Sequence, residues 1–100
     1  MEETFVKPEE KAYTIYSKSG CPNCIKVKNF LQEKKQSFRV IDCDDYLIED
    51  KELFLNIIQQ LANKSVKTFP MVFHNGKFVG GFEDTINHFD VLNAFSDTDF

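Results

Sequence analysis

Apolar and polar residues recur along this chain with two different periods, and these periods predict its secondary structure. Runs rich in β-branched and aromatic residues predict strands over residues 12–17, 38–42, 71–74 and 77–80. Apolar residues spaced three and four apart predict helices over residues 22–35, about 53–63 and about 84–95. Four residues of the last helix are expected to face the core: Ile86, Phe89, Leu92 and Phe95.

The segments between these elements carry signals of their own. Residues 1–11 are polar apart from Phe5-Val6, and they predict a short helix or an arm that docks through Phe5. Residues 42–52 are crowded with acids, which predicts a solvated loop leading into an acid-capped helix start rather than a metal site. Asn75-Gly76 between the last two strands predicts a type I′ hairpin.

The order β-α-β-α-β-β-α predicts an α/β domain. Strand, helix and strand within about thirty residues form a βαβ unit, which implies parallel pairing and a right-handed crossover. The later hairpin adds antiparallel strands, so we expect a four-stranded mixed sheet with helices on both faces. The length of 100 residues fits one domain spanning residues 1–100.

Composition narrows the class of protein. The net charge of −4 argues against a nucleic-acid-binding or membrane-surface protein. No apolar run is long enough to span a bilayer, and the acidic N-terminus lacks the features of a secretory signal. We therefore expect a cytoplasmic protein. We also expect it to be a monomer. Three cysteines are an odd number, which disfavours a disulfide framework and fits a redox pair with one spare thiol.

The redox pair is Cys21 and Cys24, at the predicted junction between a strand and a helix that begins at Pro22. A cysteine at this position lies near the exposed N–H groups of the first helical turn, which favour a nucleophilic thiolate on Cys21. Cys24 lies deeper in the helix, so its pKa should stay higher, and its sulfur can attack a mixed disulfide on Cys21. An inert core cysteine remains a real alternative for Cys24.

Other metal-ligating residues are sparse. Cys43 is expected to be a buried or loop thiol, with regulatory oxidation as a minor alternative. His74 and His88 lack ligand spacing and are expected to be surface or hairpin residues. A structural zinc site at Cys21 and Cys24 would need two further ligands, and these residues offer no paired spacing.

Three motifs occur in order: Lys18-Ser19-Gly20-Cys21-Pro22-Asn23-Cys24, then Thr68-Phe69-Pro70, then Gly80-Gly81-Phe82-Glu83-Asp84. With them the chain resembles the glutaredoxins of the thioredoxin-fold superfamily over nearly its whole length. The resemblance implies an enzyme that reduces protein disulfides and glutathione mixed disulfides, with Cys21 as nucleophile and Cys24 as resolving thiol. Glutathione would be a co-substrate, no cofactor would stay bound, and ribonucleotide reductase is one candidate protein partner.

The resemblance also implies a glutathione site. Pro70 would follow a cis peptide bond, and the backbone of Phe69 would pair with the cysteinyl part of the tripeptide. Asp84 would bind the α-amino group and the Glu83 N–H the α-carboxylate, although Asp84 could instead serve as a helix N-cap. Lys18 and Lys67 would lie near the glycyl carboxylate, with a solvated surface lysine as the alternative for Lys67. The full set of implied contacts is Lys18, Asn23, Lys67, Thr68, Phe69, Pro70, Gly81, Glu83 and Asp84.

Two residues depart from the family pattern. Asn23 stands where the commonest active site carries tyrosine, so an aromatic wall beside the thiol is missing. Phe69 stands where the family usually has valine, and its ring could reshape the groove or contact a protein substrate.

Two alternative functions stay open. A thioredoxin-like donor recycled by a flavin reductase would have no use for the Gly-Gly-x-x-Asp segment. A dimer that holds a [2Fe–2S] cluster through Cys21 and two glutathiones is disfavoured by Pro22, because proline at this position tends to block cluster assembly in the family.

Overall fold

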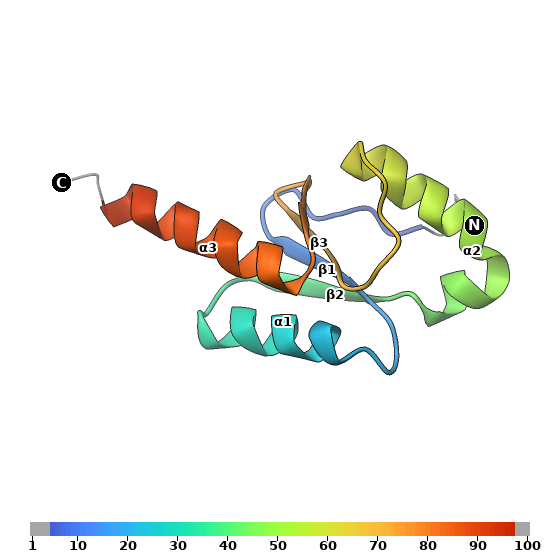
Figure 1. Cartoon of the computed structure of the whole chain (residues 1–100), viewed down its shortest axis with the longest axis horizontal. Helices are drawn as coiled ribbons and strands as arrows, with labels where there is room; N and C mark the ends of the chain where they lie inside the picture. Colours follow the sequence, from blue (N-terminus) through green and yellow to red (C-terminus); the bar gives the residue numbers. More distant parts are fainter. Residues whose placement is uncertain (1–4, 98–100) are drawn as a thin grey trace.

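The computed structural model describes residues 5–97, with side chains as far as Asn93. Within this range lie four strands, three helices and a mixed sheet whose strands run in the order β2-β1-β3-β4 (Figure 1). β1 and β2 are parallel, whereas β1–β3 and β3–β4 are antiparallel. The elements are β1 Tyr13–Ser17, α1 Pro22–Glu33, β2 Phe38–Asp42, α2 Asp44–Ala62, β3 Met71–His74, β4 Lys77–Gly80 and α3 Phe82–Asp97. The predicted element order and thioredoxin-like architecture are confirmed.

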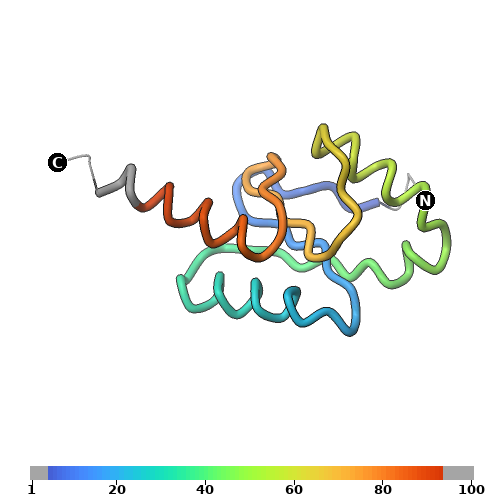
Figure 2. Tube along the Cα trace, viewed as in Figure 1, coloured from blue at the N-terminus to red at the C-terminus, as the bar shows by residue number. Residues whose placement is uncertain are grey.

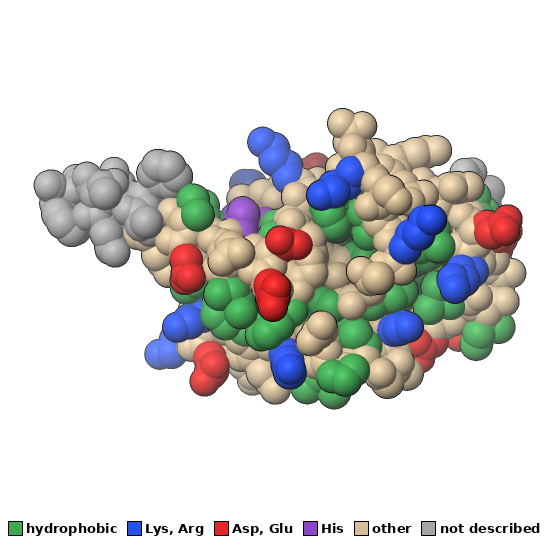
Figure 3. Space-filling view, viewed as in Figure 1, with side chains coloured by type: hydrophobic (Ala, Val, Ile, Leu, Met, Phe, Trp, Pro, Cys, Tyr) green, Lys and Arg blue, Asp and Glu red, His purple; other side chains and the backbone are tan. Residues whose placement is uncertain are grey.

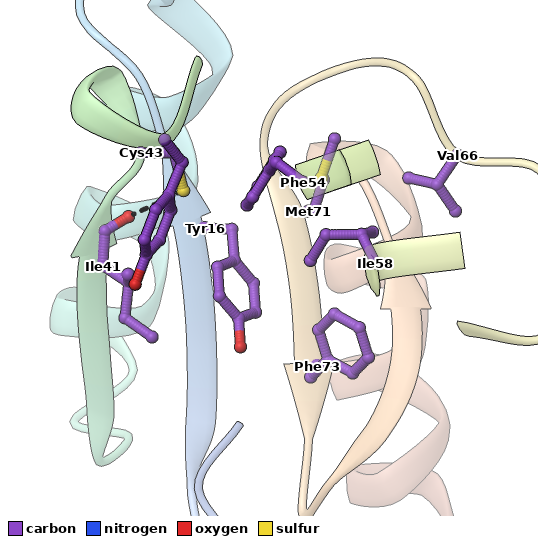
Figure 4. Packing of buried hydrophobic residues seen from close by; sticks show 9 residues of the cluster. Tyr16, Ile41, Cys43, Phe54, Ile58, Val66, Met71 and Phe73 are labelled. Atoms are coloured by element: carbon purple, nitrogen blue, oxygen red, sulfur yellow. Dashed lines mark hydrogen bonds between the residues drawn. The ribbon is translucent and has the colours of Figure 1, made fainter. Parts of the chain in front are cut away.

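The helices cover both faces of the sheet, as Figures 1 and 2 show. β1 is buried throughout, and its alternate side chains serve two hydrophobic clusters. Ile15 packs with Val27 of α1 on one face. Tyr16 packs on the other, where Figure 4 shows its side chain near Phe54 and the other labelled members of that cluster. The strand that leads to Cys21 is therefore held from both sides.

The N-terminal segment docks as an arm through Phe5, as predicted. The ring of Phe5 stacks on Tyr16 at a centroid distance of 5.6 Å and on Tyr46 at 5.7 Å. The Tyr16 hydroxyl donates to the Val6 carbonyl at 2.6 Å, and the Val6 N–H donates to the Tyr46 hydroxyl at 3.0 Å. Residues 5–11 contain no helix, so the helical alternative is wrong for them, and residues 1–4 lie outside the described part.

α2 begins earlier than the sequence predicted. The acid-rich segment is helical from Asp44 onward, so the predicted loop over residues 42–52 is wrong. Cys43 is the N-cap residue of a first short segment, and the Asp42 carboxylate one residue earlier accepts the Asp44 N–H at 3.0 Å. Asp50 then leaves helical geometry (φ −162°, ψ 89°), and its carboxylate accepts the Leu53 N–H at 3.1 Å to cap the longer segment. The predicted start near Leu53 therefore marks this second segment.

The β3–β4 turn and α3 give one confirmation and two corrections. Asn75 and Gly76 both have positive φ, 51° and 83°, which is the type I′ geometry predicted for the hairpin. α3 begins at Phe82, not Asp84. Leu92 was expected to face inward but is 40% exposed, because α3 runs outward past the edge of the sheet (Figures 1 and 2). Phe95 lies beyond the described side chains.

The outer surface carries apolar as well as charged side chains. In the space-filling view, hydrophobic atoms lie on α3 and between α3 and α1 (Figure 3). No helix in residues 5–97 combines the length and the apolar character that a membrane span requires.

Candidate functional site

Cys21 occupies the N-cap position of α1. Its backbone is extended (φ −111°, ψ 102°), and Gly20 before it adopts a positive φ of 70° that turns the chain into the helix. The Cys21 Sγ accepts the Cys24 N–H at 3.2 Å, the contact that serine or aspartate makes at other N-caps. The Cys21 residue is 8% exposed.

Cys24 lies one turn further on and is 1% exposed. Burial raises the pKa of the Cys24 thiol, and its hydrogen bond with Cys21 raises it further. The Lys18 backbone and the Ser17 side chain also hydrogen-bond to it and act in the opposite direction. A raised pKa is the direction that the depth of Cys24 in the helix predicted for this thiol.

Cys43 is fully buried at the start of α2. Its N–H donates to the Ser17 carbonyl at 2.8 Å, and its Sγ donates to the Ile41 carbonyl at 3.5 Å (Figure 4). Burial raises the pKa of the Cys43 thiol to about 12. The expectation of a buried thiol is confirmed, and at neutral pH this thiol is protonated and lacks the character that regulatory oxidation requires.

The segment before β3 provides a second side of the site. The Phe69–Pro70 peptide bond is cis, as the resemblance implied. Pro70 is buried, whereas Thr68 and Lys67 are exposed. The Phe69 ring is half-buried and lies parallel to Phe54 at a centroid distance of 6.0 Å, while the Lys18 ammonium lies 5.7 Å from its centroid.

The turn from β4 into α3 provides a third side. Asp84 is the third residue of α3, and its carboxylate accepts the Gly81 N–H at 3.2 Å, so it caps the helix from within. It is not the N-cap residue itself, because the helix starts two residues earlier. Gly80 has a φ of 134°, and a Cβ there would lie 2.2 Å from the Asp84 Oδ2. Glycine is therefore required where the carboxylate folds back.

Two surface pockets bring most of the predicted contacts together. The first, of about 160 Å³, is lined by Lys67, Thr68, Pro70, Gly81 and Asp84 among others. The second, of about 430 Å³, is lined by Asn23, Lys26, Gly81, Phe82, Glu83 and Asp84. They share Gly81 and Asp84. Lys18 lines a separate hollow with Ser19 and Asp42, and neither Cys21 nor Cys24 lines these pockets.

Comparison with known proteins decides the family. A glutaredoxin family model matches residues 13–79, which is more than half of the chain. The chain belongs to the glutaredoxin family. It is 33% identical over 91 residues to Glutaredoxin-C4 of Arabidopsis thaliana, covering 89% of this chain and 64% of that protein. It is 35% identical over 72 residues to Glutaredoxin-C6 of Oryza sativa subsp. japonica, covering 72% and 61%. The chain thus spans under two thirds of the length of these relatives.

Solved glutaredoxins share the fold. Glutaredoxin 1 from Francisella tularensis, solved as a complex with cacodylate, superimposes with a TM-score of 0.68 at 27% identity, covering 81% of this chain and 95% of that one. A buckwheat glutaredoxin solved as a complex with glutathione superimposes with a TM-score of 0.64 at 25% identity, covering 79% and 69%.

One residue of this glutaredoxin site was missed by sequence reasoning. The Asp44 carboxylate accepts the Ser19 N–H at 2.9 Å and also binds the Ser19 hydroxyl, so α2 holds the loop that leads to Cys21. These hydrogen bonds hold the pKa of the Asp44 carboxyl below its ordinary value. A signal was present, because Ser17 and Asp42 end two parallel strands side by side and the residues that follow must meet.

The two histidines form a cluster that the sequence did not predict. Their ring centroids lie 4.8 Å apart, and the Tyr13 hydroxyl is 3.0 Å from the His88 Nδ1. His74 ends β3 at the hairpin, one of the two places predicted, whereas His88 is half-buried on α3 and is neither a hairpin residue nor a fully exposed one. Tyr13 begins β1, whereas the thiols follow its end, so the cluster lies at the opposite end of the strand. In residues 5–97 no group of three or more histidine, cysteine or acidic residues is arranged to hold a metal ion.

Proposed function

We propose that this protein is a glutathione-dependent thiol–disulfide oxidoreductase in which Cys21 is the nucleophile and Cys24 the resolving thiol. The observation that carries the proposal is the N-cap position of Cys21, with the Cys24 N–H donating to its sulfur. A backbone donor and the positive end of a helix both favour negative charge on a sulfur at this position. The thiolate is the species that attacks a disulfide.

Two routes follow from the two thiols. With a glutathionylated protein, the Cys21 thiolate attacks the glutathione sulfur, the protein thiolate leaves, and a second glutathione resolves the Cys21 mixed disulfide and leaves as glutathione disulfide. With a protein disulfide, Cys21 forms a mixed disulfide with the substrate. Cys24 loses its proton and attacks Cys21, which releases the reduced protein and leaves a Cys21–Cys24 disulfide for two glutathiones to reduce.

The proposed glutathione site extends from the thiols across the two pockets. The backbone of Phe69, before the cis bond, would pair with the cysteinyl part, and Lys18 and Lys67 would bind the glycyl carboxylate. Asp84 would bind the α-amino group, and the Glu83 N–H, in the first turn of α3, the α-carboxylate. Gly81 and Asp84, which line both pockets, support this arrangement, as does the glutathione complex of the buckwheat relative.

The proposal is tested by coupling the reaction to NADPH oxidation. The wild-type protein should turn over a glutathionylated substrate with glutathione and glutathione reductase, but not with thioredoxin reductase alone. Cys21→Ser should abolish this activity. Cys24→Ser should keep it and lose the reduction of protein disulfides that requires both thiols. Turnover by Cys21→Ser, or recycling by thioredoxin reductase only, would overturn the proposal.

A further inference from the structure

The Phe69 side chain connects the loop before Cys21 to the hydrophobic core. Its ring lies parallel to that of Phe54, with an interplanar angle of 5°. Phe54 is fully buried and stacks in turn on Tyr46 at a centroid distance of 5.4 Å. The Lys18 ammonium lies 5.7 Å from the Phe69 centroid, within the range of a cation–π contact. An exposed lysine is thus placed against a ring that packs on the buried core.

We propose that Phe69 is a positioning residue that holds the Lys18 ammonium beside the Cys21 loop, ready for an anionic group of the substrate. The inference rests on the proposed function, in which that group is the glycyl carboxylate of glutathione. Lys18 lies three residues before Cys21 and Phe69 lies one residue before Pro70. The contact therefore joins the two segments between which the disulfide of the substrate would be seated.

An aromatic ring suits this role because it carries no net charge. Among the described residues, Lys18 forms no ion pair with a carboxylate. The charge of Lys18 acts on the Asp44 carboxylate from a distance, but that carboxylate already accepts hydrogen bonds from the N–H and the hydroxyl of Ser19. The ring restricts the long lysine side chain without neutralising it, so the ammonium keeps its charge for a ligand. A carboxylate partner would instead compete with the substrate.

The role belongs to the side chain of Phe69 and is separate from the backbone pairing proposed above. Any residue before Pro70 offers the same N–H and C=O, and valine, usual in the family, has no ring face for a cation. Among the described residues, three further lysine–phenylalanine contacts have similar lengths. One of them, Lys34 with Phe30 at 5.8 Å, lies at the far end of α1 and provides a matched control.

The test is a double-mutant cycle on the KM for glutathione in the coupled assay. Phe69→Leu keeps an apolar side chain against Phe54 but removes the ring, and should raise KM about two- to fivefold, the size of an exposed cation–π contact. Lys18→Met should raise KM further. In the Lys18→Met background, Phe69→Leu should add nothing, because its effect passes through Lys18. Phe69→Tyr, which keeps an aromatic ring, should have the same KM as the wild type. Lys34→Met, the control, should also leave KM unchanged.

A second measurement does not depend on turnover and begins with the wild-type protein. In NMR spectra of the wild type, the ε-methylene protons of Lys18 should show an upfield ring-current shift that Phe69→Tyr keeps and Phe69→Leu removes. Independent effects of Phe69→Leu and Lys18→Met on KM, or a Lys18 shift unaffected by Phe69→Leu, would overturn the inference. A wild type with the Lys18 shift but no glutathione-dependent turnover would overturn the proposed function instead and leave the positioning contact in place.

Discussion

Gly80 is the position in the candidate site where an added methyl group has the least room. Its φ of 134° is a conformation that L side chains rarely adopt, and a Cβ would collide with the Asp84 carboxylate. Gly80→Ala should therefore lower the free energy of unfolding by about 1–3 kcal/mol, measured by urea denaturation. Gly81→Ala is the matched control for stability, because a Cβ there would meet only the Pro70 carbonyl oxygen at 3.9 Å. Equal losses for the two variants would contradict this account.

Single residues also show how far the sequence could predict the site. The thiol pair at a helix start follows from a short motif whose chemistry is local, and the cis peptide bond at Pro70 was implied by the family resemblance; the structure has both features at the expected places. The direction of the Phe69 ring could not be predicted, because it depends on Phe54, fifteen positions away.

At the scale of elements, α2 shows why residues 42–52 were mistaken for a loop. Aspartate is a poor residue in helix interiors but a good one at helix starts, and here the carboxylates of Asp42 and Asp50 accept backbone N–H groups at the starts of two consecutive helical segments. Periodicity revealed only the longer segment, because the first is too short to show a complete apolar stripe. The missed segment is the one that carries Asp44 to the loop before Cys21.

Asp44 joins two elements, and its removal should loosen the loop that carries Ser19 and Gly20. Asp44→Ala removes both hydrogen bonds to Ser19, so the Ser19 amide should exchange with solvent markedly faster and the reaction of Cys21 should slow severalfold. Hydrogen exchange and the coupled assay measure the two effects. Asp45→Ala removes the same charge from the same helix start and should change neither. Unchanged protection of the Ser19 amide in Asp44→Ala would contradict the role of this contact.

At the scale of the whole molecule, the fold was predictable because each pattern constrained the next. The βαβ unit fixed the parallel pair and the hairpin fixed the antiparallel edge, so the layers followed without any knowledge of side-chain contacts. Contacts between distant elements were not predictable. His74 pairs with Tyr13 across the sheet and His88 reaches them from α3, and only the assembled fold brings the three side chains together.

This histidine cluster should make the stability of the molecule depend on pH. Burial lowers the pKa of both histidines below the ordinary value of 6.5, and repulsion by His88 adds to the effect on His74. The unfolded chain therefore binds protons more readily than the folded one. Stability should be complete above pH 6.5 and decline as the pH falls through the lowered folded-state values. The melting temperature should drop by a few degrees between pH 7.5 and 5.5, a window above the titration of most carboxylates. His88→Gln, which removes one titrating ring, should reduce this drop, whereas an unchanged drop would assign the pH dependence to other groups.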